Sequence, residues 1–289
     1  GGRTLDTQGA GANADAYAAG ISPNGTWQWA GRIGGTSSDR LSCVAVAPNG
    51  RIVAGGYTAS TTLTSGDDAF FSGPGQTHGG TFDGLLVTLS PTGQFVSSRI
   101  LNDNDNTYVR DVAVDPSGNV FAALGFQGNV SVGSSTLSAN GAYEAAGIAR
   151  FSSGLSPVEA WQPTGSMRVG IAGLEVTASS VTLAGQTVSP ADGQTLHFGG
   201  VSLTGEQGFV ASLNRSTDTF EWVAASGETD ITLYALSTAR FGGEDGFLVG
   251  GRVRGTTLFG DLEFPDTTRF NGFWLPLGAD GTWGVLGSP

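Results

Sequence analysis

The sequence predicts an all-β fold, a β-propeller of four-stranded antiparallel blades, and three observations carry that prediction. Two hairpin-like phrases alternate along the chain with a period of about 64 residues, which is typical of blade architectures. Turns rich in proline, asparagine, serine and glycine separate short apolar segments. No stretch keeps a helical period, because glycine or proline interrupts the chain at short intervals.

The first phrase is an outer hairpin, in which a strand of small apolar residues leads through a turn to a strand with aromatic residues. Its first copy runs from Ala16 to Trp29, with Ser22-Pro23-Asn24-Gly25 as the turn. Further copies begin at Gly84, Ala146, Gly208 and Gly272. Large side chains suit the outer strand, where neighbouring sheets splay and leave wedge-shaped space.

The second phrase is an inner hairpin, rich in alanine and glycine, whose small side chains suit strands crowded near a central axis. The best copy is Asp111-Val112-Ala113-Val114-Asp115-Pro116-Ser117-Gly118-Asn119-Val120-Phe121 and the residues up to Gly125. The others span 44–56, 174–185 and 233–251. A short link with Val-Ser or Phe-Gly segments follows three of the four inner hairpins.

Two hairpins per period give four strands per blade, in a single domain over residues 1–289. The expected repeats are 1–33 (half a blade), 34–100, 101–165, 166–226 and 227–289. That makes four full repeats plus an N-terminal half-blade, five-bladed when completed. A pair of β-sandwiches is the rival layout, and the regular long period favours the propeller.

An outer hairpin without its inner neighbour leaves a strand edge open at the N-terminal half-blade. Open edges are normally paired or covered, so either residues upstream of Gly1 complete the blade, or another copy of the chain or another protein fills the gap. A head-to-tail contact of this kind grows a ring or a fibre. The chain starts at Gly1 rather than methionine, as expected for a processed product or an excerpt of a longer precursor.

Composition and charge exclude several classes of function. All 13 basic residues are arginines, so chemistry that needs a lysine, such as a Walker-A site or a Schiff base, is excluded. A net charge of −12 opposes nucleic acid and anionic lipid as partners. The single cysteine, Cys43, allows no intrachain disulfide and is expected to be a small buried apolar residue. No apolar run is long enough for a membrane span.

The phrases at 109–133 and Ser90-Pro91-Thr92-Gly93 resemble the SBBP-type β-propeller repeat of bacterial secreted and surface proteins. That resemblance covers nearly the whole chain, although only the segment 109–133 matches the repeat well. The copy at 172–187 lacks the Asp and the Asn, and the copy at 233–251 is lengthened. It implies a propeller fold and a secreted or cell-surface location in a bacterium, and it carries no shared catalytic residues.

Candidate binding residues lie in polar loops and on the first outer hairpin. Asp103 and Asp105, within Asn102-Asp103-Asn104-Asp105-Asn106, offer oxygen ligands for Ca²⁺, but the run lacks the EF-hand glycine and glutamate, and a solvated loop is the competing interpretation. Asp67 and Asp68 lie in a long insertion between Thr58 and Gly80, a candidate partner contact. Trp27 and Trp29 are candidates for glycan binding, against the stronger interpretation of packing between blades. The two histidines, His78 and His197, lie in different repeats without metal-ligand spacing.

These patterns predict a non-catalytic extracellular scaffold or binding module that is able to self-assemble through its incomplete N-terminal blade. The partner is then a protein or a second copy, with a glycan as an alternative ligand of a lectin-like propeller. A propeller glycosidase or lyase is the third hypothesis, although no spacing selects a carboxylate pair or a nucleophile. No cofactor is expected apart from calcium as a candidate.

Overall fold

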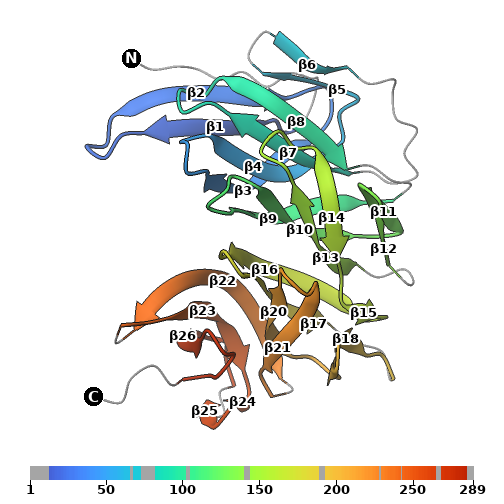
Figure 1. Cartoon of the computed structure of the whole chain (residues 1–289), viewed down its shortest axis with the longest axis vertical. Coiled ribbons are helices and arrows are strands. Elements are labelled where there is room, and N and C mark those ends of the chain that lie inside the picture. The colour runs from blue at the N-terminus through green and yellow to red at the C-terminus, as the bar shows by residue number, and fades with distance from the viewer. Residues whose placement is uncertain are drawn as a thin grey trace. The chain divides into compact units, whose positions relative to one another are not determined.

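A computed structural model describes residues 13–65, 68–72, 82–101, 105–139, 144–188, 193–227, 229–241, 243–264 and 268–284. The described residues form strands and turns without a helix, so the predicted all-β class is confirmed and no helical membrane span is present among them (Figure 1). All strand pairs with a described register are antiparallel. The chain divides into two compact units, residues 1–138 with 149–160 and residues 139–148 with 161–289.

The first unit contains three sheets whose strands follow one another as meanders (Figure 1). Sheet I has the order β1-β2-β5-β6, sheet II the order β3-β4-β7-β8, and sheet III the order β14-β13-β10-β9, with β13 beginning in residues of the second unit. The link β11-β12 forms a separate two-stranded hairpin. The strand bounds are β1 Ala16–Ile21, β2 Trp27–Gly34, β3 Asp39–Val46, β4 Ile52–Thr58, β5 Thr62–Ser65, β6 Asp68–Ser72, β7 Asp83–Leu89, β8 Phe95–Leu101, β9 Thr107–Val114, β10 Val120–Phe126, β11 Asn129–Val132, β12 Ser135–Ser138, β13 Ala145–Phe151 and β14 Pro157–Trp161.

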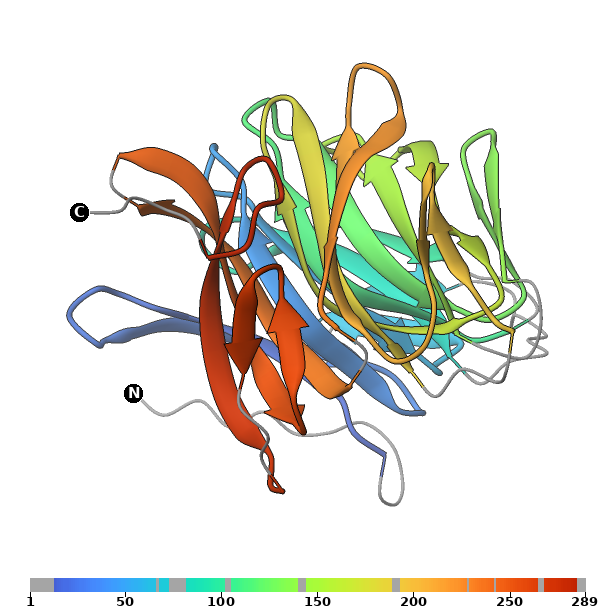
Figure 2. The ribbon, with the colours of Figure 1, turned by 90° about the horizontal axis from the view of Figure 1, so that it is seen from below.

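The second unit contains sheet IV, with the order β16-β17-β20-β21, and sheet V, with the order β22-β23-β26. Strands β22, β23 and β26, orange to red in Figure 2, form sheet V. Short strands complete the unit as a three-stranded sheet, β15-β18-β19, and a hairpin, β24-β25. The strand bounds are β15 Thr164–Gly165, β16 Arg168–Val176, β17 Ser180–Val188, β18 Leu196–Phe198, β19 Val201–Leu203, β20 Gly208–Asn214, β21 Thr219–Ala225, β22 Asp230–Phe241, β23 Glu244–Arg254, β24 Thr257–Phe259, β25 Leu262–Phe264 and β26 Asn271–Gly278.

Turn chemistry explains why the hairpins form where the sequence predicts them. In the inner hairpin β9–β10, Asp115 accepts hydrogen bonds from the backbone N–H groups of Ser117 and Asn119 at 2.9 and 2.8 Å, while Gly118 takes a positive φ of 85°. The register then pairs Val120 with Val114. The same local bonding closes the outer turn after Ser90.

The last predicted outer hairpin differs from the others, because sheet V has three strands. β26 is its first strand, and beyond the turn the described residues contribute a single bridge between Leu277 and Trp283. Of the residues from 283 onward, where the sequence predicts its second strand, only Trp283 and Gly284 lie within the described part. Three of the four expected full repeats, sheets II, III and IV, have four strands, and sheet V has three in the described residues. The expected half-blade is sheet I, which also has four strands, because β5 and β6 from the segment expected as a loop insertion pair beyond β2.

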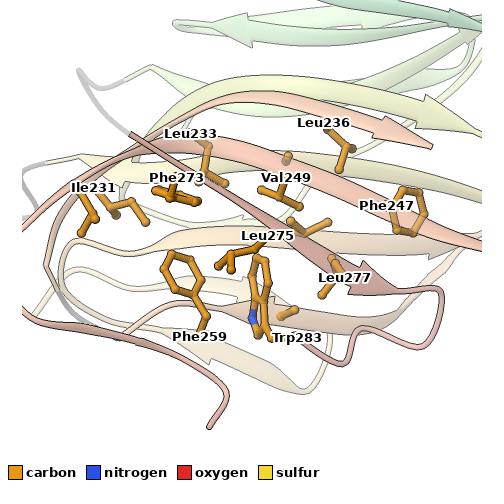
Figure 3. Close-up of a cluster of buried hydrophobic side chains, with 14 residues drawn as sticks. Ile231, Leu233, Leu236, Phe247, Val249, Phe259, Phe273, Leu275, Leu277 and Trp283 are labelled. Atoms are coloured by element: carbon orange, nitrogen blue, oxygen red, sulfur yellow. The ribbon is translucent and has the colours of Figure 1, made fainter. Parts of the chain in front are cut away.

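Apolar side chains from facing sheets form the cores of both units. In the second unit, Phe273, Leu275 and Leu277 of β26 pack with Val249 of β23 and with Val210 of β20 (Figure 3). In the first unit, Ile33 of sheet I packs with Leu85, Val87 and Leu89 of sheet II. Each core therefore lies between two sheets that follow one another in the chain, sheets I and II in the first unit and sheets IV and V in the second.

Candidate functional site

The sequence-predicted metal and loop residues do not form a site among the described residues. Asp103 and Asp67 lie outside the described residues. Asp105 is exposed at the start of the segment that leads to β9, and Asp68 pairs with Ser65 at the β5–β6 turn. Among the described residues, no group of three or more His, Cys, Asp or Glu side chains could hold a metal ion.

The two candidate tryptophans of β2 have different environments. Trp29 packs against the core between sheets I and II, and its indole lies where a Cβ on Gly93 of the neighbouring outer turn would overlap it. Trp222 repeats this arrangement in the second unit, where a Cβ on Gly281 would lie 2.7 Å from its indole. These two rings fill space between neighbouring sheets, as the packing interpretation predicted. Trp27, in contrast, is exposed.

Strand β1 is the end strand of sheet I, and β2 is its one strand partner among the described residues. In sheets II and IV the equivalent strands, β7 and β20, are paired on both sides. The open side of β1 therefore presents the backbone groups with which a further antiparallel strand could pair.

Strand β3 of sheet II lies beside this open edge and exposes apolar side chains. Its sequence, Asp-Arg-Leu-Ser-Cys-Val-Ala-Val, forms an antiparallel pair with β4 that is interrupted by a register shift at Ser42. Val44 and Val46 are both highly exposed, although neither residue lies in a loop.

A groove of about 460 Å³ lies between the edge of β1 and the exposed side of β3. Its lining is mostly apolar, from Tyr17, Ala18 and Gly20 of β1, Trp29 of β2, and Leu41, Cys43, Val44 and Val46 of β3. An apolar exposed groove next to a free strand edge combines the two features of a strand-binding surface, namely main-chain pairing and side-chain pockets.

Three positions in the chain are equivalent to Val44 because each follows the register shift of the first strand of its sheet. Val112 follows the shift in β9, Leu174 that in β16, and Leu236 that in β22. Their exposed fractions are 4%, 3% and 9%, whereas Val44 is 65% exposed. A Cβ on Gly55 of β4 would lie 3.0 Å from Val112, so the preceding inner hairpin is what covers that position in sheet III. No described hairpin occupies the corresponding place before Val44.

Cys43 lines the groove but is not a nucleophile there. Burial, followed by the charge of Asp111, raises the pKa of its thiol to about 12, and the thiol donates a 3.4 Å hydrogen bond to the carbonyl of Gly55. The thiol therefore remains protonated near neutral pH. Cys43 was expected to be buried, but its side chain is only partly buried because it lines the groove.

Asp39, at the start of β3, is a buried carboxyl whose hydrogen bonds have a structural role. Burial raises its pKa, while the Thr58 hydroxyl, the Ser60 hydroxyl and the Gly35 amide all donate to it, the last two at 2.8 Å. Both carboxylate oxygens are thus engaged in joining the β2–β3 and β4–β5 connections.

A second groove, of about 660 Å³, lies within the second unit and has a mixed polar and apolar lining. Glu221 accepts a hydrogen bond from Asn214, and Arg240 pairs with Asp245 at 2.9 Å with both side chains largely exposed. Trp222 forms part of the wall, but the Gly281 turn covers one face of its ring and Phe247 lies 6.3 Å away from its centroid. Two carboxylates, Glu221 and Asp245, line the groove, and each has its own partner, Asn214 and Arg240 respectively.

No family model matches the chain, and no curated protein matches it. The resemblance to the SBBP-type repeat therefore rests on the quoted residues alone.

Sequence reasoning placed the gap at the N-terminal half-blade but missed the residues that line it. Val44 and Val46 looked like ordinary core residues of an inner strand. The signal that could have found them was already present: β3 is the first inner strand in the chain, so nothing described before it can cover its outer side.

Proposed function

We propose that the chain is a non-catalytic scaffold or binding module of propeller type, secreted or displayed on a bacterial surface, that binds a protein partner at its incomplete N-terminal sheet. The exposure of Val44, at a position that is buried in three other sheets, is the observation that carries this proposal. The partner supplies a β-hairpin equivalent to the inner hairpins of sheets II to V.

The chemistry of that partner follows from the interfaces that the chain already contains. Its second strand pairs antiparallel with the open edge of β1, as β4 pairs with β7. It carries glycine or alanine where it crosses Val44, because Gly55 of β4 occupies that place beneath Val112 and a Cβ there already crowds the valine. The partner's hairpin is therefore rich in small apolar residues.

A synthetic peptide spanning Thr107–Phe126, the inner hairpin β9–β10, is a probe of this chemistry. The labelled peptide is expected to bind the chain with an anisotropy increase that saturates. Val44→Asp should weaken binding at least about tenfold, because a carboxylate would be desolvated against an apolar strand. Val158→Asp, at an exposed valine of β14 in the same unit, is the matched control and should leave binding unchanged.

A second peptide tests the role of the small residues. Ala123 is the residue of β10 equivalent to Gly55, since both pair directly after the register shift. A peptide with Ala123→Trp should not bind. Equal binding of both peptides, or binding that is insensitive to Val44→Asp, would show that the groove does not accept an inner hairpin.

A saccharide remains the alternative ligand, and the second groove, around Trp222, is where it would bind. The covered ring leaves little free aromatic surface for stacking, so the protein-binding proposal is preferred. Glycan-array binding that is lost on Trp222→Ala would favour the lectin-like alternative, and hydrolysis or elimination of a polysaccharide that depends on Glu221 would favour an enzyme.

A further inference from the structure

Sheet V carries an exposed patch of aromatic and arginine side chains, here called the aromatic–arginine face: Tyr234, Arg252, Phe270 and Trp274. The Arg252 guanidinium lies 4.2 Å from the centroid of the Phe270 ring and 5.7 Å from that of Tyr234. Tyr, Trp and Arg are the residues that dominate binding energy at protein interfaces. Stacking on Arg252 also orders the aromatic rings before any partner arrives, which reduces the entropy lost on binding.

This face points away from the core of the second unit. Successive side chains of a strand alternate between the two sides of a sheet. Phe273, Leu275 and Leu277 of β26 point into the core shown in Figure 3, so Trp274 projects from the other side. Trp274 is 70% exposed accordingly.

Equivalent positions in the other sheets are buried. Trp274 pairs with Gly250, the residue of β23 that lies directly after the register shift with β22. The same place is held by Leu86 opposite Gly55 in sheet II and by Val210 opposite Ala184 in sheet IV. Both are 0% exposed, and Val210 belongs to the core between sheets IV and V. Trp274 is therefore the residue that a following sheet would cover.

The hairpin β1–β2 has the complementary uncovered surface, here called the hairpin face: Tyr17, Ile21 and Trp27. Ala16 and Ala18 pack towards sheet II, so Tyr17 projects to the opposite side. Ile21 precedes the outer turn, as Leu89 and Leu277 do in β7 and β26. Those two leucines are 2% and 0% exposed, whereas Ile21 is 56% exposed.

Internal packing shows that these two kinds of face fit each other. In the core of the second unit, Leu277 and Phe273, which correspond to the hairpin face, pack with Val210, which corresponds to the aromatic–arginine face. Between Tyr17 and Ile21, the cross-strand pair Ala19–Ala30 leaves a shallow place of small residues on the hairpin face. A large ring such as Trp274 fits above small residues of this kind.

We infer that the aromatic–arginine face of one molecule binds the hairpin face of a second copy of this chain. The two surfaces differ, so the contact is heterologous and each bound molecule still offers one free face of each kind. Assembly by face packing shares Tyr17 with the hairpin-binding groove, but Ile21 and Trp27 do not line that groove. Face packing also does not use the edge of β26. That edge is blocked by Pro276, which has no N–H to donate, and by the Gly284 amide, which bonds to the Pro276 carbonyl at 3.0 Å.

Sedimentation velocity over protein concentrations up to about 1 mM tests this inference. The wild-type mass should rise continuously with concentration. Trp274→Arg and Ile21→Arg should each be monomeric under the same conditions, while the control Val158→Arg should associate like the wild type. Circular dichroism melting establishes that each variant is folded.

Mixing the two face variants gives the decisive result. Trp274→Arg keeps an intact hairpin face and Ile21→Arg keeps an intact aromatic–arginine face, so their mixture should form a dimer and stop there. A wild type that stays monomeric, single variants that still associate, or a mixture without dimer would each overturn the inference. Val44→Asp should retain self-association while losing the hairpin peptide, so that either proposal can fail without the other.

Discussion

The matched variants Val112→Ala and Val44→Ala compare the stability lost at a covered valine with that lost at an exposed valine in the equivalent position. Both valines follow the register shift in the first strand of a sheet, and both belong to the first unit. Removing the two methyl groups of a buried valine costs about 1.6 kcal/mol at ~0.8 kcal/mol per buried group, and a residual cavity adds to this. Val112→Ala should therefore cost about 2–3 kcal/mol. Val44 is 65% exposed, so Val44→Ala should cost no more than about 0.5 kcal/mol.

Thermal unfolding followed by circular dichroism is a suitable assay. For a unit of this size a loss of 1 kcal/mol lowers the Tm by about 2–4 °C, so Val112→Ala should lower it by about 4–12 °C and Val44→Ala by less than about 2 °C. Equal losses for the two variants would mean that Val44 is covered in solution, and the reasoning about an open groove would then be wrong.

Three further changes probe local features of the first unit. The Cys43 thiol, with a pKa of about 12 instead of 9.0, should react with a maleimide at pH 8 on the order of a thousand times more slowly than a free thiol, and a rate close to that of free cysteine would contradict the buried environment. Asp39→Asn should lose stability relative to the wild type as the pH falls. The raised pKa of Asp39 gives the wild type a stabilising contribution that is fully present below the ordinary pKa of 3.8 and is lost as the pH rises through the folded-state pKa. Urea titrations at pH 3 and pH 7 compare the two proteins, and a stability difference that does not change with pH would refute this. Gly93→Ala should destabilise the protein by more than about 3 kcal/mol because the new methyl group overlaps Trp29. Gly118→Ala has a similar positive φ, but its nearest neighbour would be 3.8 Å away, so it should cost only about 1–2 kcal/mol of backbone strain. Similar costs for the two variants in denaturant unfolding would argue against the packing of the Trp29 ring.

Local structure was predictable from the sequence because short-range chemistry determines it. The Asp115–Asn119 turn is closed by the side chain of Asp115 itself, so the hairpin β9–β10 needs no distant contact to be recognised. The same holds for the outer turn at Ser90, whose hydroxyl accepts from the Gln94 amide at 3.1 Å. The all-β class follows from these turns and from the alternation between them.

Burial could not be predicted locally, because it depends on which sheet lies in front of a strand. Val44 and Val112 occupy near-identical sequence contexts, Cys-Val-Ala-Val and Asp-Val-Ala-Val, yet one is exposed and the other is covered. The aromatic–arginine face was missed for the same reason, because Arg252 is brought beside Phe270 and onto the strand paired with Trp274 only by the folded sheet V.

The acidic charge of the chain opposes non-specific association through its exposed apolar faces. A net charge of −12 without any lysine makes every encounter between two copies repulsive at long range, although at physiological ionic strength this repulsion decays over about 8 Å. Non-specific apolar contacts bury too little surface to overcome it, whereas two complementary faces bury large rings together. Arg252 and Arg254 both lie beside Phe270 and place positive charge at the aromatic–arginine face, although Arg254 is also paired with Asp230. The net negative charge makes two copies repel each other, and the arginines reduce this repulsion at one face. Together these effects favour a single orientation of approach, which is the property that a head-to-tail scaffold requires.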